Sequence, residues 1–81
     1  MSNISQSDVI IVIEEALKIK PGSLQENTRA EEIDNWDSLG QLSILVALDR
    51  LFDGKIVSIA DMAEADSIPK IFDILKQHSL L

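Results

Sequence analysis

Apolar residues recur every three or four positions along most of the chain, which is the spacing of one face of an α-helix. In the first such segment the apolar positions are Val9, Val12, Ile13, Ala16 and Leu17. The β-branched run 9–13 is also typical of a strand, but no second strand of comparable strength follows for it to pair with. We therefore predict a helix from about Ser5, which opens a capping-box-like sequence, to Ile19, with Pro21-Gly22 as the stop signal.

A mostly polar stretch from Pro21 to about Asp37 separates this helix from the next periodic segment. We predict a long connecting loop here, held in place by Leu24, Ile33 and Trp36, its large apolar residues. The second helix is predicted over residues 38–52, and its apolar arc is wider than one buried face requires. It is either the central helix of the domain, or part of its surface is left for a partner.

Two shorter helical segments complete the pattern. Ser58-Ile59-Ala60-Asp61 reads as a capping box that opens a short helix to about Glu64, and Ser67-Ile68-Pro69 opens a last helix to about His78. We predict one all-α domain over residues 1–81. Its fold is a four-helix bundle with a long loop between helices 1 and 2 and a short third helix.

Composition limits what such a domain does. The 81 residues include 14 acidic and 7 basic side chains, a formal charge of −7, and the pI is about 4.4. A chain this short has little room for both a core and a deep catalytic cavity, so an enzyme is disfavoured. The acidic balance opposes binding to nucleic acids and anionic membranes, and it favours partners with basic docking surfaces.

Cysteine is absent, which excludes disulfides and thiolate chemistry by the protein itself. The apolar run Val9–Ile13 is followed at once by Glu14 and Glu15, unlike a signal sequence or a membrane span. We expect a cytoplasmic monomer that does not insert into membranes.

Few side chains suggest catalysis or metal binding. His78, the only histidine, falls in the last helical turn, where a cation complements the helix dipole. The acidic cluster at positions 31, 32, 34 and 37 lacks the ligand spacing and central glycine of a calcium loop. We expect no catalytic residue and no metal site.

The start of the second helix is the most informative place. Asp37 is a good N-cap, and Ser38 then falls in the first turn, near solvent and near unpaired backbone amides. The amides and the positive end of the helix dipole stabilise a phosphate attached there.

The sequence Asp37-Ser38-Leu39, together with the apolar pattern that follows it to Phe52, resembles the acyl carrier protein family. In that family the serine of an Asp-Ser-Leu motif at the start of the second helix carries a 4'-phosphopantetheine arm. The resemblance covers nearly the whole chain.

The resemblance implies covalent attachment of the arm from coenzyme A at Ser38, flanked by Asp37 and Leu39. It also implies a phosphopantetheinyl transferase and acyl-loading and acyl-transferring enzymes as partners. The reactive thiol then belongs to the arm, which agrees with the lack of cysteine.

The resemblance also indicates a partner-binding face on the second helix. Its candidate residues are Asp37, Leu39, Leu42, Val46, Asp49 and Arg50. Carriers of primary fatty acid synthesis usually have carboxylates where this chain has Gly40, Ser43 and Arg50. We therefore expect a freestanding carrier of a specialised lipid, polyketide or related pathway.

Several alternatives share this sequence pattern. A second triplet, Asp66-Ser67-Ile68, precedes Pro69, so Ser67 is expected to be the N-cap of a core-packing helix. A peptidyl or aminoacyl carrier has the same fold and the same serine. An unmodified helical adaptor would instead bind a partner through the wide apolar arc, without an arm.

For a carrier, we also expect the helices to move slightly apart and enclose an acyl chain. The expected walls are Val12, Leu42, Val46, Met62 and Ile68.

Overall fold

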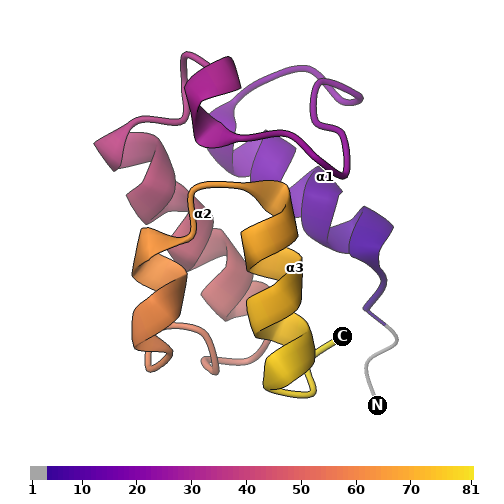
Figure 1. The fold of residues 1–81 in the computed structure, drawn as a ribbon, viewed down its shortest axis with the longest axis vertical. Helices are drawn as coiled ribbons and strands as arrows, with labels where there is room; N and C mark the ends of the chain where they lie inside the picture. Colours follow the sequence, from indigo (N-terminus) through magenta and orange to yellow (C-terminus); the bar gives the residue numbers. More distant parts are fainter. Residues whose placement is uncertain (1–3) are drawn as a thin grey trace.

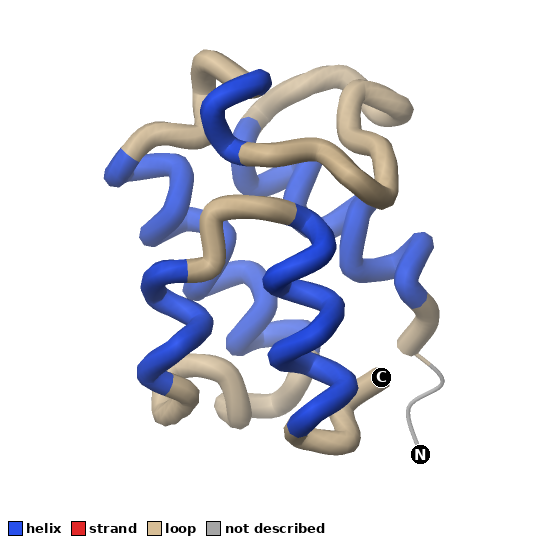
Figure 2. Tube along the Cα trace, viewed as in Figure 1, coloured by secondary structure: helices blue, strands red, loops and turns tan. Residues whose placement is uncertain are grey.

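The computed structural model describes residues 4–81, which fold into three α-helices and two short 3₁₀ helices (Figures 1 and 2). The α-helices are α1 (Gln6–Leu17), α2 (Ser38–Leu51) and α3 (Ile68–Gln77), and the 3₁₀ helices are η1 (Ala30–Glu32) and η2 (Ala60–Glu64). Over these residues there is no β-strand, only an isolated bridge between Arg29 and Ser67. The all-helical prediction is confirmed. The four-helix bundle is not, because the described chain holds three α-helices.

The predicted short third helix is the 3₁₀ helix η2. Its N-cap is Ile59, which makes no side-chain capping bond, so the predicted capping box at Ser58 is wrong. The amide of Met62 donates to the carbonyl of Ile59, and the amide of Ala65 donates to the carbonyl of Met62. These three-residue steps are the 3₁₀ pattern, which is common in segments this short.

The first helix begins as its sequence predicts and ends two residues early. Ser5 Oγ accepts from the amide of Asp8 at 3.2 Å, and Asp8 Oδ2 accepts from the amide of Ser5 at 3.0 Å, which completes the capping box. Lys18 then adopts a left-handed conformation (φ 58°) and ends the helix before the predicted Pro21-Gly22 stop.

The core lies where the three α-helices meet, with α1 packed against α2 (Figure 1). Its fully buried side chains include Val9, Ile13, Ile44, Leu48, Ile56, Met62, Ile68, Ile71 and Leu75. The long loop adds Leu24 and Trp36, which are buried as predicted for loop anchors. The third predicted anchor, Ile33, is half-buried and also packs against the core. Only part of the wide apolar arc of α2 faces this core.

The long loop is attached to the helices at both ends. The buried carboxylate of Glu14 accepts hydrogen bonds from the amides of Gly22 (2.8 Å) and Leu24 (3.1 Å). Further along, the amide of Ala30 donates to the carbonyl of Asp66 at 2.7 Å, and the carbonyl of Thr28 accepts from Ile68 at 2.8 Å. These bonds hold the loop across the start of α3 and bring it to the first turn of α2 (Figure 2).

Candidate functional site

Ser38 is the first residue of α2, and its side chain is exposed. The preceding residue, Asp37, is the N-cap, and its Oδ1 accepts from the amide of Gly40 at 2.9 Å. This arrangement confirms the predicted N-cap. The serine hydroxyl is therefore placed at the positive end of a 14-residue helix, accessible to another molecule.

A close approach of backbone segments fixes the first turn of α2. A Cβ atom at Gly40 would overlap the carbonyl oxygen of Asn35 and lie 2.9 Å from Leu17 Cδ2. Asn35 Nδ2 donates to the carbonyl of Leu17 at 2.9 Å, which ties the loop to the end of α1. Glycine at position 40 thus lets three segments converge next to Ser38.

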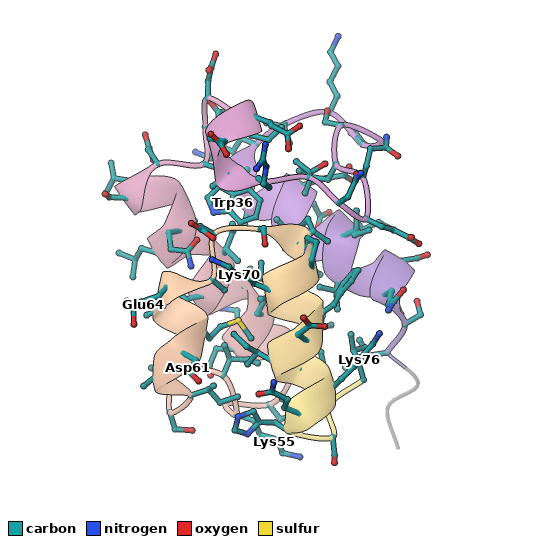
Figure 3. The ribbon with its side chains drawn as sticks, viewed as in Figure 1. Trp36, Lys55, Asp61, Glu64, Lys70 and Lys76 are labelled. Atoms are coloured by element: carbon teal, nitrogen blue, oxygen red, sulfur yellow. The ribbon has the colours of Figure 1, made fainter. Side chains whose placement is uncertain are left out.

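A second set of hydrogen bonds joins the loop, α2 and η2. Trp36 is buried and lies beside the start of α2 (Figure 3), and its Nε1 donates to Gln41 Oε1 at 2.7 Å. Gln41 Nε2 donates to the carbonyls of Met62 (3.1 Å) and Ala63 (3.3 Å). Sequence reasoning identified Trp36 as an anchor but missed Gln41, because nothing in the local sequence marks a glutamine whose partners lie in η2.

An open pocket of about 550 Å³ lies directly beside Ser38. Trp36, Gln41 and Ala63 are among the residues that line it, together with the carboxylate residues Asp37, Glu64 and Asp66. Figure 3 shows Glu64 projecting from η2 on this side of the molecule. The pocket therefore combines apolar surface with three carboxylates beside the exposed serine.

One carboxyl group of this pocket has a shifted pKa. The Nζ of Lys70 donates to Asp66 Oδ1 at 2.9 Å, and this hydrogen bond, with the attraction of the two charges, lowers the pKa of Asp66 below its ordinary value of 3.8. The carboxyl group of Asp66 is therefore ionised at neutral pH and does not act as a proton donor there.

The predicted apolar contacts of α2 are on the molecular surface. The exposed fractions are 75% for Leu39, 58% for Leu42 and 45% for Val46. Arg50 is also exposed, and a second open pocket of about 340 Å³ is lined by Ala16, Leu42, Ser43, Val46, Ala47 and Arg50. These side chains do not belong to the buried core.

Asp49 has a different environment from the other predicted contact residues. It is half-buried, and its Oδ1 accepts from the amides of Ile56 and Val57, each at 3.0 Å. The carboxylate thereby holds the segment that follows α2, where Asp53 and Gly54 both have positive φ. Asp49 has this structural role whether or not a partner also contacts it.

The other predicted positions separate into buried and exposed groups. Ser67 is buried and its Oγ accepts from the amide of Lys70 at 3.2 Å, which confirms it as the N-cap of α3.

The residues predicted to enclose an acyl chain differ in burial. Met62 and Ile68 are buried, whereas Leu42 and Val46 are exposed. Val12 is half-buried and packs against the core. Leu42 and Val46 therefore do not line a common interior with the other three predicted container residues.

The described residues contain neither a cluster of metal ligands nor a helix that could span a membrane. Within residues 4–81, no three acidic or histidine side chains are grouped so that they could hold a metal ion. In the acidic loop, Glu31 and Glu32 pair with Arg29 at 3.4 and 3.9 Å. None of the helices over the described range is both long and apolar enough to cross a lipid bilayer.

Comparison with models of known protein families gives no match, and no similar chain is found among the curated proteins or the solved structures.

Proposed function

We propose that this protein is a freestanding carrier protein that holds acyl intermediates as thioesters on a 4'-phosphopantetheine arm attached to Ser38. The observation that carries the proposal is the exposed Ser38 at the first position of α2, inside the sequence Asp37-Ser38-Leu39. The other serine of an Asp-Ser-aliphatic triplet, Ser67, is buried. Exposure therefore favours Ser38 for a reaction that takes place in the active site of another enzyme.

The residues around Ser38 suit such an attachment. When bound, the arm would supply the thiol that carries the acyl group. Ser38 Oγ would form the bond to phosphorus as 3',5'-ADP leaves coenzyme A, and the hydroxyl proton would pass to a base of the transferase. Because Asp37 already occupies the amide of Gly40, the helix offers fewer donors to the phosphodiester, which favours an arm held by its covalent bond and free to move.

The arrangement of elements is compatible with the carrier layout, with η2 in place of a short third helix. The partners in this proposal are a phosphopantetheinyl transferase and the acyl-loading and acyl-transferring enzymes of a specialised lipid, polyketide or related pathway. A net charge of −7 favours their approach through basic surfaces. The carrier itself performs no catalysis.

Two alternative functions remain consistent with these features. A peptidyl or aminoacyl carrier uses the same serine and differs in its cargo. An unmodified helical adaptor is favoured by one observation, the exposed apolar residues Leu39, Leu42 and Val46 on α2. The adaptor requires no modification of Ser38.

The test is loading of the purified protein with coenzyme A, Mg²⁺ and a broad-specificity phosphopantetheinyl transferase, followed by intact mass. Wild type and Ser67→Ala should each gain one arm, and Ser38→Ala none. Because Ser38 is exposed, Ser38→Ala should change the free energy of unfolding by no more than about 0.5 kcal/mol, so loss of loading would not reflect unfolding. Wild-type protein that several transferases leave unmodified would refute the carrier and favour the adaptor.

A further inference from the structure

The side chain of Gln41 joins three elements of the fold beside Ser38. Gln41 is half-buried near the start of α2, and Ser38 precedes it by three residues, so the two positions are neighbours on the helix surface. Its Oε1 accepts from Nε1 of Trp36 in the loop, and its Nε2 donates to the carbonyls of Met62 and Ala63 in η2. A single amide group therefore connects the loop, α2 and η2.

The chemistry of these partners favours an amide at position 41. The indole N–H of Trp36 can only donate a hydrogen bond, and a backbone carbonyl can only accept one. The connecting side chain must therefore carry both an acceptor and a donor, as glutamine does. A glutamate would accept from Trp36 but would place a negative charge against two carbonyl oxygens, and the thioether of methionine is only a weak acceptor.

η2 is short, and Gln41 supplies a polar attachment for it. The helix has five residues, and its N-cap, Ile59, makes no side-chain hydrogen bond. Carbonyl groups near the end of a helix often lack a partner within it, and those of Met62 and Ala63 accept from Gln41. The buried side chain of Met62 anchors the inner side of η2, whereas Ala63 and Glu64 are exposed. Gln41 therefore helps to fix the exposed side of η2 relative to α2.

The three elements that Gln41 connects are also the walls of the pocket beside Ser38. Trp36 lines this pocket from the loop, Ser38 from α2, and Ala63 and Glu64 from η2 (Figure 3). An enzyme that modifies Ser38 must cover the surface immediately around the hydroxyl, so it contacts these walls. Walls that are already held in place spare such an enzyme the entropic cost of ordering them.

We infer that Gln41 is a positioning residue for the modification of Ser38. Through Trp36 and η2 it fixes in advance the surface on which the modifying enzyme binds. The inference rests on the proposed function for the reaction itself. Because Gln41 holds this surface and does not carry the reacting hydroxyl, its loss should weaken binding of the protein to the enzyme and leave the chemical step unchanged. The KM for the protein then rises while kcat is retained.

The test compares the loading kinetics of wild type and Gln41→Met with a phosphopantetheinyl transferase, coenzyme A and Mg²⁺. The concentration of the protein is varied at a temperature at which every variant is folded. Gln41→Met should raise the KM for the protein about three- to tenfold at an unchanged kcat, and Gln41→Glu should give a similar rise. Gln77→Met is the matched control, because it makes the same change at an exposed position on α3 and should load like wild type.

A second measurement separates positioning from a simple loss of stability. Trp36 is the only tryptophan, so its indole N–H gives one identifiable signal in the ¹⁵N spectrum. This signal should shift in Gln41→Met, which lacks a strong acceptor, and should stay near its wild-type position in Gln41→Glu, which retains one. Ile71→Val lowers the stability through the buried core of α3 and should change neither the KM nor the indole signal.

Four results would overturn the inference while the wild type still loads. They are equal KM values for wild type and Gln41→Met, a fall in kcat without a change in KM, an indole signal that Gln41→Met does not move, and a rise in KM that Ile71→Val reproduces. In each case the proposed function stands. Wild-type protein that does not load would refute the proposed function itself, and with it a role for Gln41 in that reaction.

Discussion

Substitution of Gly40 by alanine tests whether the first turn of α2 is held by close contact with the loop and α1. The added methyl group would overlap the carbonyl oxygen of Asn35 and press on Leu17 Cδ2. Because a backbone carbonyl is difficult to displace, we assign this overpacking a cost of about 1–3 kcal/mol. Loss of the hydrogen bond from Asn35 Nδ2 to the carbonyl of Leu17 adds about 1 kcal/mol.

The opposing effect is smaller. Alanine is favoured over glycine in a helix by at most about 1 kcal/mol. The net expectation is that Gly40→Ala lowers the free energy of unfolding by about 1–3 kcal/mol, with a fall in Tm of roughly 4–8 °C for each kcal/mol. Under the proposed function, the displaced first turn should also slow loading of Ser38, because a transferase would have to recognise this turn.

The assay is urea unfolding followed by circular dichroism and by the emission of Trp36, the only tryptophan. Ser43→Ala, at an exposed position of the same helix, is the control and should stay within about 0.5 kcal/mol of wild type. If Gly40→Ala is as stable as wild type or more stable, helix propensity outweighs the contact and the argument for a closely packed first turn is refuted.

Two further predictions concern carboxylates. Asp49→Leu should lower the free energy of unfolding by about 1–2 kcal/mol, because the amides of Ile56 and Val57 lose their acceptor. Asp49→Asn retains an acceptor oxygen and should lie closer to wild type; equal urea midpoints for the two variants would contradict this role. Lys70→Gln should raise the pKa of Asp66 towards its ordinary value of 3.8, as measured by NMR titration. Because the folded-state pKa is lowered, the ion pair stabilises the protein above the unfolded-state pKa, and this effect is lost as pH falls through the folded-state pKa. An unchanged Asp66 titration would show that Lys70 is not the cause.

The candidate site could be located from sequence because its signals are local. The N-cap at Asp37 and the exposed serine after it depend on residues within one helical turn, and the structure contains both features. The wide apolar arc of the second helix allowed two interpretations, a central helix buried in the domain or a helix with part of its surface left for a partner. The burial of Ile44 and Leu48 and the exposure of Leu39, Leu42 and Val46 show that α2 supplies both a core face and a surface stripe.

The sequence by itself determined the positions of the three α-helices and their N-caps at Ser5, Asp37 and Ser67, because capping and helical periodicity act between residues a few positions apart. The tertiary structure alone decided the roles of Glu14, Gln41 and Asp49. Their carboxylate or amide groups bind backbone atoms 7 to 22 residues away. Such partners meet only after the chain has folded, because backbone groups outside the helices then form hydrogen bonds with whichever side chain can reach them.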